Sequence, residues 1–242
     1  MTLKKKFFKE KNIKLALGLV YLTIVVLFLY LLLSNFNYED FTSYKFLQLN
    51  REYLISFKEK NILFTSFVLI FITVIWILLL GFGTPIALIS GFIFGKWLGT
   101  FLVVIGMSFG AGILYIISLF FFKDLIESIF AKRFDYLEKK FRKKELSIMI
   151  IFRIIGLVPF AVANVLPVLF NIKFKNYFFG TMIGITPAVF VMTSLGSGFE
   201  TIIGSNNEMP SFLSLISASE IYIPVLSFLL IIVLAFFIKK KF

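Results

Sequence analysis

Arg153 is the one charged residue in a long apolar stretch that runs from residue 146 to residue 172. An arginine at mid-membrane depth costs about 2.5–3.5 kcal/mol on insertion scales, so it persists where it faces a cavity, a carbonyl cluster or an anion. Its planar guanidinium group forms paired hydrogen bonds with phosphate. Asn164, in the same stretch, could add another. Together they indicate an anion site. Two alternatives stay open: Arg153 snorkels to the surface near Lys144, and Asn164 only satisfies broken backbone.

Two prolines add a second feature of such a site. Pro85 and Pro159 follow glycine-containing breaks, and proline is well tolerated at the first position of a helix. Each is expected to open a half-helix whose N-terminal amides and positive dipole end favour an anion. The hydroxyl of Thr84 could cap the first half-helix, whereas Val158 cannot cap the second and would leave its amides for a ligand. The predicted binding residues are Arg153, Pro159, Asn164, Thr84 and Pro85.

The composition narrows the chemistry further. The chain has no cysteine and no histidine, which excludes disulfides and removes the usual zinc ligands and the most common general base. No acidic residue lies inside an apolar segment, so no proton relay is expected. We expect no enzyme, no cofactor and no metal site. In a chain this apolar, the net charge of +12 suits anionic lipid headgroups better than nucleic acid. The sequence makes no prediction about oligomeric state.

The elements that position these residues are membrane helices. Hydrophobic residues make up 60% of the 242, and 34 residues are phenylalanine, which predicts an all-α polytopic membrane protein. We divide the chain into three parts. Residues 1–60 form an N-terminal transmembrane helix and a surface segment, and residues 61–199 form the core. Residues 200–242 form a C-terminal loop and a last transmembrane helix.

Two broken apolar segments in the core predict re-entrant hairpins. The first covers residues 61–98 with its tip at 81–84, and the second covers residues 146–172 with its tip at 156–158. Irregular backbone at membrane depth is tolerated only inside protein or beside a cavity, which favours a hairpin over an exposed loop. Full spans follow at 100–122 and 177–199. In the alternative, 61–98 is two full spans, because residues 61–80 are long enough to cross alone.

The two halves of the core also repeat. Each copy has a proline followed by two glycines that are four residues apart. A shift of 74 residues superposes the copies, which are Pro85, Gly106 and Gly110, and Pro159, Gly180 and Gly184. Because the hairpins open on opposite sides, this is an inverted repeat, which is typical of transporters with a central site. The glycine pairs also let helices pack closely. The residues given structural roles are Gly91, Gly95, Gly106, Gly110, Gly180, Gly184 and Pro187.

The distribution of charge predicts the orientation. Lysines cluster at both termini and in residues 123–145, whereas residues 34–60 are neutral and residues 200–220 are acidic. The positive-inside rule then places both termini in the cytoplasm of a multi-pass protein of the cell membrane. Residues 123–145 have apolar residues at helical spacing and are expected to form an amphipathic helix at the headgroups. Lys96, beside Trp97, is expected to anchor the chain at the interface.

The motifs that carry these features resemble a known family. They are GFIFGKWLGTFLVVIGMSFGAGILY, from Gly91 to Tyr115, and R-x5-PF-x3-N-x12-Y-x2-GT-x2-G-x2-P, from Arg153 to Pro187. Both resemble the VTT domain of the DedA superfamily, also called the SNARE-associated Golgi protein family. The nearer likeness is to bacterial relatives of the yeast Golgi Tvp proteins. The resemblance implies two facing re-entrant hairpins and a role in moving lipids across a bilayer, such as phospholipid scrambling or recycling of a polyprenyl-phosphate carrier.

The chain departs from that family at several positions. Gly156 stands where the family often has proline, Ala161 where it often has asparagine, and Val168 where it often has glycine. The membrane-embedded acid and the second arginine of the members with proposed proton coupling are both absent. The resemblance therefore favours passive movement of lipid as a flippase or scramblase. The alternatives are a small-solute or ion transporter, and a non-transporting membrane-organising protein that docks partners on residues 123–145.

Overall fold

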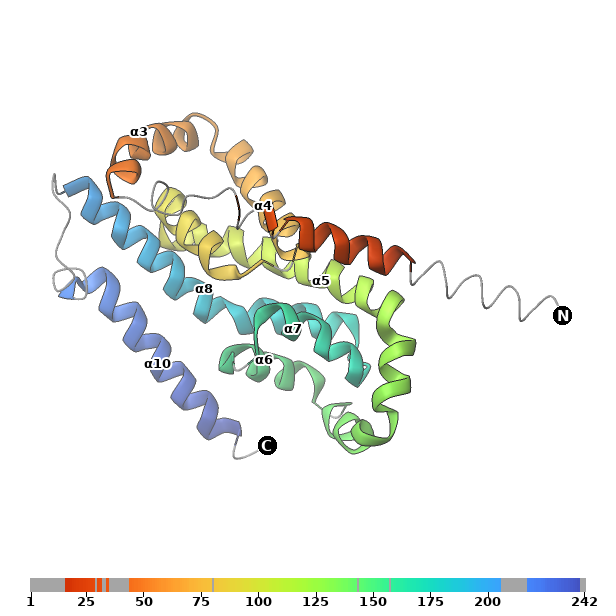
Figure 1. The fold of residues 1–242 in the computed structure, drawn as a ribbon. Helices are drawn as coiled ribbons and strands as arrows, with labels where there is room; N and C mark the ends of the chain where they lie inside the picture. The colour runs from red at the N-terminus through yellow and green to blue at the C-terminus, as the bar shows by residue number, and fades with distance from the viewer. Residues whose placement is uncertain are drawn as a thin grey trace.

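A computed structural model describes residues 16–28, 30, 31, 34, 44–79, 81–142, 144–156, 158–205 and 217–239, with the backbone alone for some stretches, chiefly 121–142. These residues form helices and short turns without a strand, which confirms the all-α class. The elements are α3 (Tyr44–Lys60), α4 (Ile62–Leu78), α5 (Gly83–Arg142), α6 (Glu145–Ile155), α7 (Phe160–Val165), the 3-10 helix η1 (Leu166–Phe170), α8 (Phe174–Ser205) and α10 (Ser219–Lys239) (Figure 1).

The chain reverses direction at the tip of the first hairpin and again at Gly95, where the hairpin joins the long helix that follows it. α4 ends at Leu78 and α5 begins at Gly83. Within α5, Gly95 has φ 76° and ψ 172°, a region that is essentially reserved for glycine, and the backbone there is not helical. The hydroxyl of Ser90 donates to the carbonyl oxygen of Gly99 across this turn, at 3.2 Å. Residues 83–94 therefore form the returning arm, and residues 96–120 form the long helix beside it.

The depth of the first tip follows from its neighbours on the long helix. Gly83 lies against Met107, because a Cβ at position 83 would be 2.5 Å from the methionine Cε. Met107 is about 18 Å along the helix from Gly95 and about 20 Å from Phe120, at 1.5 Å per residue. The tip thus stops well short of the far end of a helix long enough to cross a bilayer. This is the geometry of a re-entrant hairpin and argues against two full spans.

The second hairpin repeats this arrangement. α6 ends at Gly156, which has the left-handed φ of 60°, and α7 and η1 form the returning arm. Gly180 of α8 packs against Met149 of α6, as Gly106 of α5 packs against Thr73 of α4. In both halves the first arm of the hairpin lies parallel to the long helix that follows it.

α5 and α8 run antiparallel, so one half is inverted relative to the other (Figure 1). Thr100 near the start of the long helix of α5 is hydrogen-bonded to Thr193 late in α8, with 2.6 Å between the hydroxyl oxygens. Further along, the rings of Phe109 and Phe178 lie 5.3 Å apart. Gly91 of the first returning arm touches the backbone of Thr193, and a Cβ would not fit there. These contacts confirm the predicted inverted repeat of hairpin and transmembrane helix.

Two described helices are long and apolar enough to cross a membrane. They cover Gly83–Phe120, with a mean hydropathy of 2.2, and Phe174–Gly204, with a mean hydropathy of 1.7. α3 and α4 together would be a third candidate, but the chain bends by 110° between them. The predicted first and last spans appear as shorter apolar helices, Ala16–Phe28 and Ile221–Ile231. The chain termini lie outside the described residues.

Some predicted details differ from the structure. The predicted tip at 81–84 is shorter in the structure: Gly81 and Phe82 are not helical, whereas α5 already begins at Gly83. Thr84 is therefore the second residue of α5 and no cap, and Pro85 is its third. Proline fits there because the first-turn amides of a helix have no intrahelical partner. Pro159 is the N-cap of α7 and not its first residue. α8 continues through Pro187.

Residues 123–145 are the predicted amphipathic helix. The backbone of α5 is helical as far as Arg142, and a new helix, α6, begins at Glu145. The side chains of residues 123–143 lie outside the described part of the structure, and with them the apolar face.

The tips of the two hairpins meet on an apolar cluster between α5 and α8. Ile77 and Ile86 come from the first hairpin, and Phe160, at the start of α7, packs against the same cluster from the second. Met107 and Ile185 supply the surface beneath them. Both hairpins thus contribute apolar residues to this cluster, and the polar side chains around Arg153 lie inside the second half of the protein.

Candidate functional site

Arg153 lies in the centre of a buried polar cluster. It is only 6% exposed, so it does not snorkel to the surface. Its Nη2 donates to Asn164 Oδ1 at 2.8 Å and to the Tyr177 hydroxyl at 3.1 Å. Its Nε donates to the Thr181 hydroxyl at 3.2 Å. The guanidinium carbon also lies 5.3 Å from the centre of the Phe160 ring, within the range of a cation–π contact.

Three elements of the second hairpin bring these side chains together. α6 carries Arg153 and packs against Gly184 of α8, whose missing side chain leaves room for the arginine. Tyr177 and Thr181 are four residues apart on α8 and so face the same side. Asn164 comes from the short helix α7. Because the chain breaks between α6 and α7, the side-chain amide of Asn164 turns back toward Arg153. In one continuous helix it would lie out of reach of the arginine.

Tyr177 joins the cluster to the first half of the protein. Its hydroxyl oxygen lies 3.2 Å from the carbonyl oxygen of Ala111 in α5 and 3.2 Å from that of Asn164. Its ring stacks on Tyr115, with 4.3 Å between the centroids. Tyr115 in turn donates to the carbonyl oxygen of Ile172, at the end of the second hairpin. The position of Arg153 thus depends on both halves of the repeat.

The cluster has more donors than acceptors. Arg153 Nη1 and Asn164 Nδ2 are both buried and have no hydrogen-bond partner among the residues that the structure describes. Among the described residues no carboxylate pairs with Arg153. A buried donor without a partner costs about 1–3 kcal/mol, and more when the group is charged. Two such donors beside an uncompensated positive charge fit an acceptor that is itself negative, such as a phosphate oxygen.

The structure brings only some of the predicted binding residues together. Arg153 and Asn164 are hydrogen-bonded, and both are buried. Pro159 is exposed at the start of α7. Thr84 and Pro85 are exposed in the first turn of α5 and form no hydrogen bond with the cluster. The predicted polar contact between the tips is replaced by Phe160, whose ring covers the guanidinium group and packs on the apolar cluster.

Two members of the cluster were not among the predicted binding residues. Tyr177 and Thr181 are both fully buried and both contact Arg153. The signal for them was present in the motif that runs from Arg153 to Pro187, where a tyrosine and a threonine stand four residues apart. That spacing puts them on one face of a helix, but it does not show which residue they face.

A buried carboxylate closes the base of the second hairpin. Glu145 accepts a hydrogen bond from the backbone amide of Lys173 at 3.1 Å and another from Asn176 Nδ2 at 2.6 Å. It thus lies at the N-terminus of α8, where the helix dipole favours negative charge. Within the described part of the chain, no three His, Cys, Asp or Glu side chains gather in a way that could hold a metal ion.

Comparisons with known proteins point in one direction. Residues 81–198 match the family model of the VTT domain. A transmembrane protein 41 homolog from Caenorhabditis elegans is 28% identical over 156 residues, which cover 62% of this chain and 62% of that protein. The chain thus matches about three-fifths of the length of this curated relative. No solved structure matches.

Proposed function

This chain carries a VTT domain, as its motifs predicted, and we propose that it moves lipids across the bilayer as a scramblase or flippase. One observation carries the proposal: Arg153 and Asn164, which are hydrogen-bonded to each other inside the second hairpin, each keep a buried donor without a described partner, Nη1 and Nδ2. We assign these donors to the phosphate of a lipid headgroup. The substrate class is a phospholipid or a polyprenyl-phosphate carrier, which share that phosphate.

The chemistry of the cluster supports a phosphate. A guanidinium group and a primary amide both donate in a plane, and a phosphate oxygen accepts from several donors at once. The cost of the unpaired donors is removed when the anion binds and returns when it leaves. A site of this kind lowers the barrier for a headgroup at mid-membrane without holding it permanently. The acyl chains stay in lipid throughout.

The inverted repeat supports movement rather than static binding. The two hairpins enter from opposite ends of the α5–α8 pair, and their tips meet beside Met107 and Ile185. Arg153 and Asn164 are enclosed in this arrangement, so a headgroup reaches them when the second returning arm moves. That arm is short, with six residues in α7 and five in η1. Short helices have little stability of their own, which suits a moving part.

The distribution of charged residues supports two further parts of the proposal, which are the passive mechanism and the orientation in the membrane. No carboxylate pairs with Arg153 in the described structure, which favours passive movement over proton exchange. The basic termini favour a location in the cell membrane with both ends in the cytoplasm. The nearer likeness to bacterial relatives of the Golgi Tvp proteins belongs to the same proposal.

Liposomes that contain the purified chain test this function. Fluorescent phosphatidylglycerol in the inner leaflet becomes accessible to an external quencher only when it crosses. We expect the wild-type chain to accelerate crossing and the Arg153→Gln variant to lose at least about ten-fold of the rate, the effect of one charge-assisted hydrogen bond. Lys175→Gln, which removes an exposed cation of α8, is the matched control. Equal rates for all three chains would reject the proposal, and flux of a small anion without movement of lipid would favour a solute transporter.

A further inference from the structure

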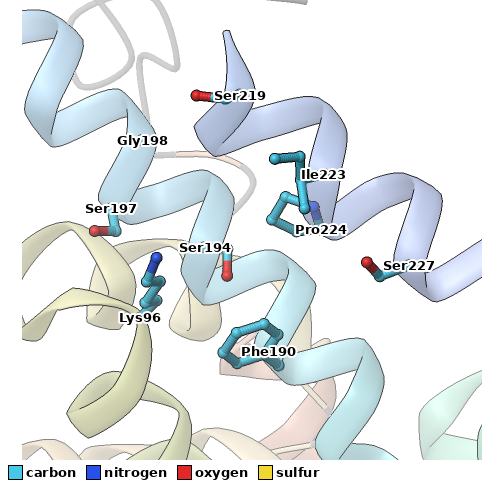
Figure 2. Close-up of a pocket in the computed structure, with 9 residues that line it drawn as sticks. All are labelled: Lys96, Phe190, Ser194, Ser197, Gly198, Ser219, Ile223, Pro224 and Ser227. Carbon is cyan, nitrogen blue, oxygen red and sulfur yellow. The ribbon is translucent and has the colours of Figure 1, made fainter.

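A second polar site lies at the other end of α8, away from the Arg153 cluster. A cavity of about 250 Å³ lies between α8, α10 and the turn at Gly95. Its polar lining consists of one cation and several hydroxyls, contributed by Lys96, Ser194, Ser197, Ser219 and Ser227 (Figure 2). Phe190, Ile223 and Pro224 supply its apolar lining. The cavity is therefore built from a lysine, serines and an apolar wall.

The turn that carries Lys96 is held firmly. The carbonyl oxygen of Lys96 accepts a hydrogen bond from the hydroxyl of Thr100, and the hydroxyl of Thr193 lies 2.6 Å from that of Thr100 and 3.3 Å from the carbonyl oxygen. Gly95, with its φ of 76°, separates the returning arm from the helix that begins at Lys96, and the contact between Thr100 and Thr193 ties the start of this helix to α8. The side chain of Lys96 extends from the fixed turn toward Ser194 and Ser197 (Figure 2). A ligand that binds a lysine on a fixed backbone loses less conformational entropy than one that must also order a flexible loop.

Ser194 supplies an unpaired donor in the same cavity. Its side chain is 2% exposed, and its hydroxyl has no hydrogen-bond partner within the protein. Other hydroxyls on α8 behave differently: Thr186 and Thr201 donate to the carbonyl four residues earlier, at 2.7 Å and 3.1 Å. Such back-bonding is the ordinary way to satisfy a helix hydroxyl. Ser194 is one of the residues that line the cavity, so an unused donor lies at its wall.

Among the described side chains, none compensates the charge of Lys96. No described carboxylate forms an ion pair with it. The carboxylate of α8 that lies beyond the cavity, Glu200, is already engaged by Arg51 of α3. An anionic group in the cavity would meet the ammonium group of Lys96 and the hydroxyl of Ser194 together. A phosphoryl oxygen suits both, because it accepts strong hydrogen bonds from cations and hydroxyls alike.

We propose that this cavity, between Lys96 and Ser194, is a second binding site for a phosphoryl group. Ser194 lies ten residues beyond Gly184, the residue that packs on Arg153, and is therefore about 15 Å further along α8. That is half the thickness of the hydrocarbon core, so the two sites lie at different depths. The apolar wall formed by Ile223 and Phe190 suits the glycerol and upper acyl carbons of a lipid. Only the choice of a lipid as source rests on the proposed function.

Trp97 is a natural reporter for this cavity. It neighbours Lys96, and its ring lies 5.0 Å from the ring of Phe190, which lines the cavity. The chain has only two tryptophans, so the Trp97→Phe variant gives the background from Trp76. The experiment titrates the detergent-solubilised full chain with water-soluble dihexanoyl-phosphatidylglycerol, dihexanoyl-phosphatidylcholine or inorganic phosphate, and follows the fluorescence of Trp97.

We expect a saturable change with dihexanoyl-phosphatidylglycerol. Its dissociation constant should rise about ten-fold in Lys96→Gln and several-fold in Ser194→Ala, as expected when a cation or a donor to phosphate is removed. Ser194→Ala only removes an unpaired buried hydroxyl, so it is expected to fold as the wild type does. Ser66→Ala, on α4, is the matched control, because Ser66 bonds back to Ile62 far from the cavity. A comparable constant for inorganic phosphate would make the free anion the source, and a response to the lipid alone would make it a headgroup.

The proposal is overturned if the wild type shows no saturable change, or if the two cavity variants bind as the wild type does. It is also overturned if Arg153→Gln abolishes the Trp97 response, because the two sites would then not be separate. Retained binding at Trp97 in a chain that does not move lipid across liposomes would reject the proposed function and leave this site standing.

Discussion

Gly184 of α8 lies directly against Arg153 of α6: a Cβ at position 184 would stand 2.5 Å from the Cβ of the arginine. The same relationship holds in the other half, where a Cβ at Gly110 would stand 2.8 Å from the Cβ of Ile77. Equivalent glycines of the inverted repeat therefore contact different residues. Gly184 contacts the charged Arg153, and Gly110 contacts the apolar Ile77. The two halves share their packing but not their chemistry.

This contact makes Gly184→Ala a sharp test of the packing. The added methyl group would also meet the carbonyl oxygen of Ile150 at 2.8 Å, so α6 must move away. Overpacking of this kind costs about 1–3 kcal/mol, and it displaces Arg153 from its partners. We expect a lower melting temperature and slower lipid movement in liposomes.

Two glycine variants control for that result. Gly110→Ala should lower the melting temperature as much, because it meets Ile77 in the same way, and should leave the Arg153 hydrogen bonds intact. Gly18→Ala meets nothing within 4 Å and should leave stability unchanged or raise it. A Gly184→Ala chain that melts and transports like the wild type contradicts the close packing of α6 on α8.

Replacing both unpaired donors by apolar groups should separate stability from function. Arg153→Met with Asn164→Leu removes a buried charge and two donors that have no partner in the protein. Replacing a buried ion pair by apolar residues of similar size is often neutral or stabilising by about 1–4 kcal/mol, and a lone buried charge carries the same desolvation cost without the attraction of a partner. We expect an equal or higher melting temperature together with loss of lipid movement. A destabilised chain that still moves lipid would show that Arg153 serves only the fold.

The turn at Gly95 is expected to depend on its backbone alone. A Cβ at this position would meet nothing within 4 Å, yet its φ of 76° and ψ of 172° suit only glycine. Gly95→Ala should therefore destabilise the chain by about 1–3 kcal/mol through strain and not through a clash. Thermal unfolding in detergent measures the loss, and an unchanged melting temperature would mean that residues 83–94 do not fold back beside the long helix.

The hydroxyl pair that fixes Lys96 should show energetic coupling. The hydroxyl of Thr100 donates to the Lys96 carbonyl oxygen and is paired with the hydroxyl of Thr193. A double-mutant cycle with Thr100→Val and Thr193→Val should give a coupling free energy of about 0.5–1.5 kcal/mol, typical of a buried hydrogen bond. Additive losses, with a coupling near zero, would place the two helices further apart than described.

Much of the fold was predictable because membrane depth forbids irregular lipid-exposed backbone. Breaks near Pro85 and Pro159 therefore predicted hairpins, and the paired glycines predicted where helices approach. The end of the first hairpin was predicted near residue 98, because Lys96 interrupts the apolar run, but the exact position of the turn at Gly95 was not. Only its φ shows why a glycine stands there.

The candidate site was predictable in part for a related reason. A lone arginine in an apolar stretch has a high free-energy cost of insertion, which predicts a functional role for Arg153. Asn164, on the next short helix, is hydrogen-bonded to it. Thr84 and Pro85 were expected beside them because both tips were expected to be polar. Phe160 and Ile86 instead pack on one apolar cluster, and their apolar character gave no signal that the two halves share it.

The central claim is that Arg153 holds the phosphate of a lipid, and solid-state NMR measures that contact directly. Arginine side chains labelled with ¹⁵N in phosphatidylglycerol bilayers lose signal when a ³¹P nucleus lies within a few ångströms. The wild-type chain should show a component of this loss that is absent from Arg153→Lys and retained in Arg51→Lys. A loss of signal identical in all three chains would mean that no headgroup reaches Arg153.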